Sequence, residues 1–243
     1  MTGGMIHWLR GFIFTLNIYP MMLVMGIVFL PYALLTPKGA VLACRTYARY
    51  VMFSARWMLG ITTEIRGTPP TEEVLIASKH QSFLDIIMIF NAVPQPKFIM
   101  KRELLYTPVI GQYAYRLGCV PVRRGRRAEA IKQMVQDVKA GRSTPGQLCI
   151  YPQGTRIRPG VVAPYKIGTY ALYRELEQPC VLAATNAGLF WPRSGMAKSP
   201  GHAVVEFLDP IPPHVPQEVF MADMETRIEA ASNALMEEAG FKP

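Results

Sequence analysis

The feature that most constrains the fold is a run of 25 residues, Gly11 to Leu35, without a single charged side chain. A helix of about 20 apolar residues is long enough to cross a lipid bilayer. Because Pro20 and Pro31 interrupt the run, we expect a tilted, kinked or re-entrant membrane element rather than a clean span. The alternative is a buried helix of a soluble core, which a charge-free run of this length fits less well.

A basic segment that also carries aromatic residues follows this run. Its Arg45, Arg49 and Arg56 recur at intervals of four and seven, so a helix would place them on one face, suited to the lipid headgroup layer. We therefore expect residues 1–60 to form a membrane-embedded, membrane-anchoring helical pair, and residues 61–243 to form the domain that carries the chemistry. Positive charge after the apolar run predicts that this domain lies on the cytoplasmic side of the membrane.

Composition restricts the class of partner. The chain has 243 residues and a formal net charge of +9, although half of its residues are hydrophobic and only 18% are charged. This balance points to an anionic membrane face or to phosphorylated substrates. Nucleic acid is not expected, because aromatic residues are not interleaved with the basic ones as a stacking platform requires. The four cysteines form no CxxC pair and the four histidines are scattered, so no metal site is expected either.

Beyond residue 60, apolar runs typical of buried strands alternate with helical patterns, which predicts an α/β core. In the stretch from Lys101 to Arg124, glycines allow close approach of the backbone and basic residues gather at the two ends; the simpler interpretation is a solvated basic loop. The expected strands are Ile61–Gly67, Glu73–Ser78, Pro96–Met100, Gln147–Tyr151, Cys180–Thr185 and Ala203–Leu208. The expected helices are one that opens at Asp85 and runs through Phe90, then Arg126–Ala140, Lys166–Glu177 and Glu218–Gly240.

A candidate catalytic pair follows the second expected strand. His80 stands where the strand ends, and Asp85 stands near the start of the next helix. If His80 lies in the turn and Asp85 in the first helical turn, the carboxylate can fold back onto the imidazole. It would then fix the tautomer and support a general base. The simpler interpretation is a surface-loop histidine and an aspartate that only caps the helix.

A second turn of interest follows the strand that ends near residue 151. It reads Tyr151-Pro152-Gln153-Gly154-Thr155-Arg156. Arg156 can bind a phosphate bidentately, and exposed backbone N–H groups can help. The turn is not a P-loop, because the required glycine spacing and the Lys-Ser/Thr pair are missing. The alternative is a tight turn with a surface arginine.

Four blocks of residues, spread over roughly residues 60–210, resemble the glycerolipid acyltransferase family, in particular its bacterial 1-acylglycerol-3-phosphate acyltransferases. The segment from His80 to Asp85 matches the family's His-x4-Asp block. Residues 151–156 match the block usually written Phe-Pro-Glu-Gly-Thr-Arg, and Cys180 to Asn186 stand where the apolar fourth block lies. The second block is matched by Lys101, Glu103, Leu104, Pro108, Gly111, Gly118 and Arg124. Four blocks in order are far more specific than any one of them.

The resemblance implies an αβ sandwich of the acyltransferase type behind the N-terminal helical pair. It implies transfer of a fatty acyl group from acyl-carrier protein or CoA to the free hydroxyl of a lysophospholipid. The most direct acceptor is 1-acylglycerol-3-phosphate, giving phosphatidic acid at the cytoplasmic face of the bacterial inner membrane. His80 and Asp85 would be catalytic, and no metal or prosthetic cofactor is implied. The implied substrate-binding residues are Lys101, Arg124, Gln153, Gly154, Thr155 and Arg156.

One position departs from the family pattern and leaves the acceptor open. Gln153 replaces the usual Glu, which keeps the size and the carbonyl acceptor but removes the charge and adds a donor. One alternative is therefore an acyltransferase for another lyso-lipid, such as a lyso-aminoacyl lipid. A non-catalytic membrane lipid-binding protein is an alternative of another class. A lipid hydrolase would need water, or a serine or cysteine nucleophile, next to His80; Ser78 and Ser82 are candidates but lack a Gly-x-Ser-x-Gly context.

Overall fold

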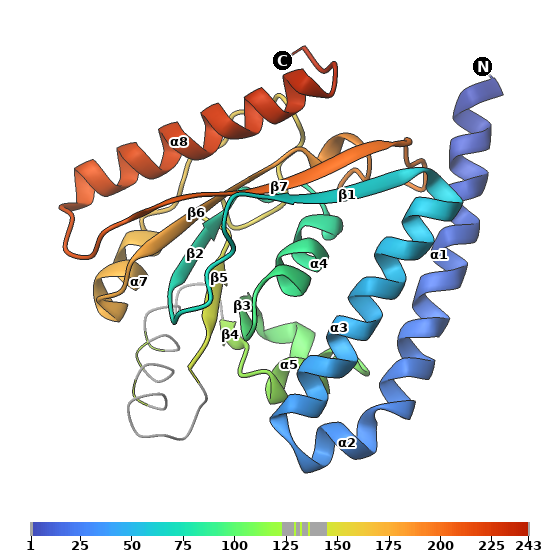
Figure 1. The fold of residues 1–243 in the computed structure, drawn as a ribbon, viewed down its shortest axis with the longest axis horizontal. Helices are drawn as coiled ribbons and strands as arrows, with labels where there is room; N and C mark the ends of the chain where they lie inside the picture. The colour runs from blue at the N-terminus through green and yellow to red at the C-terminus, as the bar shows by residue number, and fades with distance from the viewer. Residues whose placement is uncertain (1, 123–128, 130–131, 133–135, 137–144, 243) are drawn as a thin grey trace.

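A seven-stranded sheet runs through the middle of the molecule, as the computed structural model shows for residues 2–122, 129, 132, 136 and 145–242 (Figure 1). Its strands are β1 (Ile61–Arg66), β2 (Leu75–Ser78), β3 (Pro96–Lys101), β4 (Val120–Val122), β5 (Gln147–Ile150), β6 (Cys180–Thr185) and β7 (Gly201–Ile211). The helices are α1 (Thr2–Val28), α2 (Leu30–Leu35), α3 (Pro37–Ser54), α4 (Phe83–Ala92), α5 (Ile110–Arg116), α7 (Gly168–Leu176) and α8 (Gln217–Glu238). A π-helix covers Ala55–Leu59, and 3₁₀ turns cover Arg102–Tyr106 and Ala187–Leu189. The predicted α/β class is confirmed.

The order of the strands is β1-β7-β6-β2-β5-β3-β4. Strands β6, β2, β5, β3 and β4 run parallel to one another, whereas β7 is antiparallel to β6 and parallel to β1. The carboxyl ends of the five parallel strands therefore meet at one edge of the sheet. In open α/β sheets, ligands bind outside this edge.

Both faces of the sheet are covered, which explains why its central strands are buried along their whole length. On β2, Ile76 belongs to a cluster with residues of α1, α3 and α4, whereas Leu75 and Ala77 belong to a second cluster with residues of α7 and α8. Alternate side chains of one strand thus serve opposite layers. The result is the expected sandwich, with α8 on one side of the sheet and α4, α3 and α1 on the other (Figure 1).

The N-terminal segment forms a helical hairpin. α1 continues through Pro20 without a break, so the expected interruption there is wrong; Pro31 instead lies in the first turn of α2, where proline is tolerated. α3 returns alongside α1, and the Tyr50 hydroxyl donates to Asn17 Oδ1 at 2.8 Å. The portion Gly4–Val28 is, by length and composition, long and apolar enough to cross a membrane.

Two arginines of the basic face of α3 contact the end of α4. Arg45 Nη2 donates to the carbonyl oxygens of Val93 (2.8 Å) and Pro94 (3.2 Å), and Arg49 Nε donates to Asn91 Oδ1 (3.3 Å). These groups lie at the carboxyl end of α4, where unsatisfied carbonyls favour a cation. Arg45 and Arg49 therefore help to hold α3 against α4.

The helical pair also shares its core with the sheet. Phe14 and Ile18 of α1 and Val51 of α3 are buried in the same cluster as Ile76 and Ala183 of the sheet. Gly60, with φ of 73°, ends the π-helix and turns the chain into β1. The division into an anchor of residues 1–60 and an acyl-transferring domain of residues 61–243 stays a prediction about function.

The stretch from Lys101 to Arg124 is not a plain loop. It contains a 3₁₀ turn, α5 and β4, which the sequence pattern missed because each is short and punctuated by glycine or proline. α5 is stabilised by tertiary contacts: Tyr113 packs against Ala40 and Ala43 of α3 and donates to the Gly26 carbonyl at 2.8 Å. The helix expected at Arg126–Ala140 lies mostly outside the described residues.

Candidate functional site

The turn between β2 and α4 is built by a capping box. Ser82 is the N-cap, and its hydroxyl accepts a hydrogen bond from Leu84 N at 3.0 Å. Asp85 stands at the third helical position, and its Oδ2 accepts from Ser82 N (2.7 Å) and Gln81 N (2.8 Å). These bonds satisfy backbone donors that a helix start leaves open. They also place the carboxylate in one fixed orientation.

The other carboxylate oxygen holds the histidine. His80 Nδ1 lies 2.9 Å from Asp85 Oδ1; the Asp85 side chain is fully buried, while that of His80 keeps 12% exposure. An ionised carboxylate only accepts, so Nδ1 carries the proton and Nε2 is left as an acceptor. The expectation that the carboxylate folds back onto the imidazole is confirmed. The alternative that Asp85 only caps the helix is wrong, because one of its oxygens caps the helix start while the other binds His80.

Lys79, the residue before His80, fixes this turn through contacts with α8 and β6. Lys79 is buried and forms an ion pair with Glu229 of α8, while its backbone N–H donates to the Ala183 carbonyl at 2.9 Å. A buried lysine needs such a partner, because leaving it unpaired would be costly. Lys79 is thus held toward α8 while His80 is held by Asp85.

An aromatic ring stacks on the imidazole. The ring centroids of His80 and Tyr151 are 3.9 Å apart with an interplanar angle of 20°, and Tyr151 stacks in turn on Phe98 at 6.3 Å. Burial raises the pKa of the Tyr151 phenol well above its usual value, and nearby Cys149 and Asp85 add to the effect. Tyr151 is therefore neutral, and its ring packs on the imidazole. Nothing in the spacing of the sequence singled it out.

The turn that follows β5 meets the histidine segment directly. β2 and β5 are neighbouring parallel strands, so both turns leave the same edge of the sheet. Gly154, with φ of 71°, closes the turn by donating to the Tyr151 carbonyl at 2.8 Å, and Ile157 N donates to the His80 carbonyl at 2.8 Å. The structure thus brings the Arg156 turn beside His80, as expected. Gly154 and Thr155 are exposed there, and Arg156 is half-buried.

Lys101 is the last residue of β3, which follows β5 in the sheet order, and its side chain is exposed. It is paired in register with Val122, the last residue of β4. Lys101 therefore lies at the same edge as the two turns. Arg124, the other basic residue expected here, lies outside the described residues.

A lysine that sequence reasoning missed lies over the second turn. The backbone N–H of Lys166 donates to the Pro152 carbonyl at 3.0 Å, which closes the loop of residues 152–166. A Cβ on Gly154 would come 2.7 Å from Lys166 Nζ, so the ammonium group rests directly on the glycine. In the part of the chain that the structure describes, Lys166 pairs with no carboxylate. It adds a second cation to the turn of Arg156.

A family model described as Acyltransferase matches residues 61–185, about half of the chain, and this range contains both turns. The chain belongs to the acyltransferase family.

This acyltransferase-family chain is 31% identical over 159 residues to the 1-acyl-sn-glycerol-3-phosphate acyltransferase of Pseudomonas aeruginosa, a match that covers 65% of the chain and 62% of that protein. It is 27% identical over 169 residues to the 1-acyl-sn-glycerol-3-phosphate acyltransferase alpha of Mus musculus, covering 67% of the chain and 59% of that protein. The chain thus spans about three fifths of the length of these curated relatives.

Among solved structures, the crystal structure of the 1-acyl-sn-glycerophosphate (LPA) acyltransferase PlsC from Thermotoga maritima superposes with a TM-score of 0.76 at 18% identity. The match covers 93% of this chain and 97% of that one. Similarity at this level of identity shows that the two share a fold.

In this member of the acyltransferase family, Gln153 lies inside the turn rather than at its surface. Its side chain is 4% exposed, and Nε2 donates to the Ala163 carbonyl at 3.2 Å. An ionised glutamate, usual at this position in the family, has no proton to donate to that carbonyl. Gln153 therefore braces the loop of residues 152–166, which carries Arg156, from within.

Proposed function

We propose that this protein transfers a fatty acyl group from an acyl thioester to the free hydroxyl of 1-acylglycerol-3-phosphate, giving phosphatidic acid. The observation that carries the proposal is the fully buried Asp85 bound to His80 Nδ1, beside the turn that bears Arg156. The family and the names of the two curated relatives support the same reaction.

In the proposed reaction, His80 Nε2 takes the proton from the acceptor hydroxyl as its oxygen attacks the thioester carbonyl carbon. The tetrahedral intermediate then collapses, the C–S bond breaks, and the leaving thiolate takes the proton from the imidazolium. The products are an ester and a free thiol, and no atom or electron is left over. Asp85 stabilises the imidazolium and keeps Nε2 unprotonated between turnovers.

Binding of the acceptor phosphate is assigned to the cations around the second turn. Arg156 offers a planar fork of donors suited to phosphate, and Lys166 and Lys101 add point charges at the same edge. Holding the phosphate there places the acceptor hydroxyl near His80. Fixing reactants in this way lowers the activation barrier by removing their translational freedom before the chemical step.

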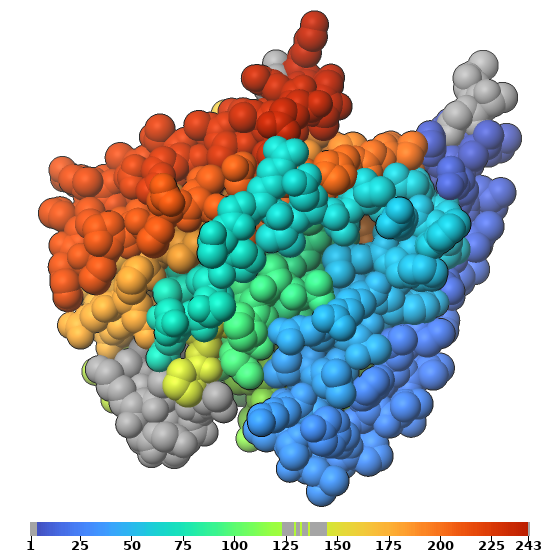
Figure 2. All heavy atoms as spheres, viewed as in Figure 1, coloured from blue at the N-terminus to red at the C-terminus, as the bar shows by residue number. Residues whose placement is uncertain are grey.

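The apolar N-terminal helices suit an enzyme whose acceptor and product are lipids. Large apolar side chains of α1 remain exposed, and the N-terminal helices form one flank of the molecule (Figure 2). The exposed residues of α1 include Ile6, Trp8, Phe12, Leu16, Leu23 and Ile27. We propose that this flank is embedded in the bacterial inner membrane, with the sheet edge on its cytoplasmic face.

The hydrolase alternative is disfavoured by the two candidate nucleophiles. The Ser78 hydroxyl is buried and donates to the Lys79 carbonyl at 2.9 Å, and the Ser82 hydroxyl is engaged as the helix cap. Neither is bound to His80. A non-catalytic lipid-binding protein would not require the imidazole to be held by a buried carboxylate with its second nitrogen free.

The test is acylation by purified protein offered several lyso-lipids with acyl-CoA and acyl-carrier-protein donors, with products identified by mass spectrometry. We expect phosphatidic acid from wild type and none from His80→Ala, while His80→Ala still fractionates with membranes. Acylation of only a lyso-aminoacyl lipid would replace the acceptor. Retained activity in His80→Ala would remove the mechanism.

A further inference from the structure

The last helix, α8, contacts both of the segments that form the candidate site. Its Glu229 lies outside residues 61–185, the part of the chain that the family model matches. Glu229 Oε1 accepts a hydrogen bond from the Tyr165 hydroxyl at 2.8 Å, and the same oxygen accepts one from Lys79 Nζ. A single carboxylate oxygen therefore joins two segments that lie far apart in the sequence.

Each of the two donors stands directly before a residue of the proposed site. Lys79 precedes His80, the general base, and Tyr165 precedes Lys166, the second cation of the acceptor turn. Neighbouring residues share a planar, stiff peptide unit, so fixing one of them limits where the next can lie. Glu229 thereby limits how far the imidazole and the ammonium group of Lys166 can move apart.

Burial makes these contacts difficult to replace by water. Lys79 is 3% exposed and Tyr165 is 8% exposed, whereas the Glu229 side chain keeps 27% exposure. Burial raises the pKa of the Tyr165 phenol above its usual value, and the charge of Glu229 adds to this effect, so the hydroxyl stays protonated and keeps donating. Within the described ranges, Lys79 pairs with no other carboxylate. Loss of Glu229 would leave a buried ammonium group without an anion, which is costly.

A second residue of α8 contacts the other neighbour of the base. Gln81, which follows His80, donates from Nε2 to Met236 Sδ at 3.5 Å. Met236 lies about two helical turns after Glu229, so both lie on one face of α8. The two residues that flank His80 are thus both held by the same face of this helix.

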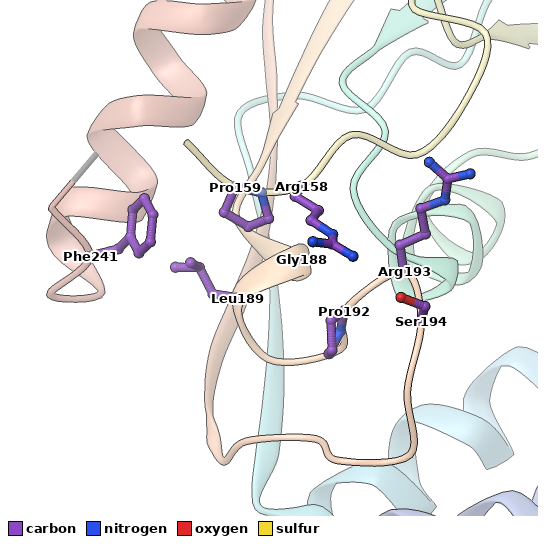
Figure 3. Close-up of a pocket in the computed structure, with 8 residues that line it drawn as sticks. All are labelled: Arg158, Pro159, Gly188, Leu189, Pro192, Arg193, Ser194 and Phe241. Carbon is purple, nitrogen blue, oxygen red and sulfur yellow. The ribbon is translucent and has the colours of Figure 1, made fainter. Parts of the chain in front are cut away.

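The end of α8 also contacts the loop that carries the second turn. Phe241, just beyond the helix, lines a pocket of about 440 Å³ together with Pro159 (Figure 3). A Cβ on Gly160 would come 3.2 Å from the Phe241 ring, so the ring rests directly on the loop of residues 152–166. The helix and its end therefore contact this loop at both Gly160 and Tyr165.

We propose that Glu229 is a positioning residue for acyl transfer, which holds the histidine segment and the loop of residues 152–166 at the separation that brings the acceptor hydroxyl to His80 Nε2. It acts through Lys79 and Tyr165 rather than by contact with a substrate. A displacement of about 1 Å at a reacting group costs roughly a hundredfold in rate, so a contact remote from the chemistry has a large effect. The inference rests on the proposed function and adds the residue that keeps its two halves together.

Three variants separate the two contacts. Tyr165→Phe removes only the hydroxyl, so the KM for 1-acylglycerol-3-phosphate should rise about fivefold, while kcat and the donor KM stay within about twofold of wild type. Lys79→Met removes the contact on the side of the base, so kcat should fall about tenfold with little change in the acceptor KM. Glu229→Ala removes both contacts and should show both effects. Glu229→Gln keeps an acceptor oxygen without its charge and should recover most of the loss.

Two control variants make the same chemical changes at nearby positions. Tyr170→Phe on α7 and Glu225→Ala on α8 alter side chains that form no hydrogen bond or ion pair within the described residues. Both should keep wild-type kinetics.

A Glu229 that only stabilises the fold gives a different result. Glu229→Ala would then melt at a lower temperature, but its acceptor KM and its kcat per folded molecule would equal those of wild type, which overturns the proposal. Should Glu229→Ala fail to fold, an unchanged acceptor KM in Tyr165→Phe or an unchanged kcat in Lys79→Met overturns it instead.

A double variant tests whether Tyr165 acts through Lys166. Tyr165→Phe combined with Lys166→Ala should raise the acceptor KM no more than Lys166→Ala alone, because the two residues act as one unit. Effects that multiply would show that Tyr165 acts independently and would refute its part in the proposal.

Equilibrium titration provides a readout that does not need turnover. Detergent-solubilised Tyr165→Phe should bind 1-acylglycerol-3-phosphate about fivefold more weakly than wild type and should bind 1-acylglycerol equally well. Equal affinity of the two proteins for the phosphorylated lipid would contradict the proposal. Failure of the proposed function would look different, because wild type would then yield no acylated lyso-lipid with any donor.

Discussion

Replacing Asp85 by asparagine separates the two jobs of this side chain, because the volume hardly changes while one acceptor oxygen becomes a donor. Gln81 N and Ser82 N both point at Oδ2, so the amide oxygen of the Asp85→Asn variant must stay there and its NH₂ group must face His80 Nδ1. Nδ1 then has to accept, which moves the imidazole proton to Nε2. The nitrogen that faces the acceptor hydroxyl can no longer take its proton.

The expected magnitudes differ for activity and stability. Forcing the wrong tautomer on a catalytic histidine costs roughly 10³–10⁴-fold in kcat. Loss of the negative charge at the amino end of α4 costs only about 1 kcal/mol, or roughly 2–4 °C in melting temperature for a chain of this size. Asp85→Asn should therefore be nearly inactive yet folded.

Ser82→Ala is the matched control. It removes the hydrogen bond that the Ser82 hydroxyl accepts from Leu84 N at 3.0 Å, which costs about 1 kcal/mol. The contact between His80 and Asp85 stays intact. The assay is initial-rate acyl transfer at saturating donor and acceptor, with thermal unfolding followed in the same detergent. If Ser82→Ala loses as much activity as Asp85→Asn, or if Asp85→Asn stays within about tenfold of wild type, Asp85 is only a helix cap.

Three further predictions address the remaining parts. Arg156→Ala and Lys166→Ala should each raise the acceptor KM about tenfold and leave the donor KM unchanged in steady-state kinetics; the reverse pattern would move the phosphate site. Gln153→Glu should lower the free energy of unfolding by about 1–3 kcal/mol in denaturant titrations, because an ionised Glu cannot donate to the Ala163 carbonyl; unchanged stability would refute this bracing role. Burial lowers the pKa of Lys198, whose Nζ lies 5.4 Å from the Trp191 ring, below its usual 10.5. The unfolded chain then binds more protons than the native one just below pH 10.5, so stability should rise with pH there, and Lys198→Met should flatten that rise in unfolding midpoints.

The N-terminal region shows where local pattern misleads. The spacing of Arg45 and Arg49 correctly indicated a shared helical face, yet that face meets the carboxyl end of α4. Pro20 reads as a helix breaker but is accommodated inside α1, which packs against α3 and the π-helix. Helical pattern reveals which residues share a face and does not reveal what the face contacts.

The sequence likewise predicted only part of the candidate site. The pairing of His80 with Asp85 was predictable, because the two are five residues apart across one strand-to-helix turn. Lys166 was not, since it reaches the site through a loop whose path depends on how β5 and α7 pack. Tyr151 lies beside His80 only because β5 is the neighbour of β2.

By itself the sequence determined the α/β alternation, the buried character of the central strands and the short-range geometry of the His-x4-Asp turn. These features follow from side-chain periodicity and from hydrogen bonds between residues close in the chain. The order of the strands, the burial of Gln153 and the ammonium of Lys166 over Gly154 were decided only by tertiary structure. Each depends on which distant segments pack together, and packing is selected by the free energy of the whole core rather than by any local pattern.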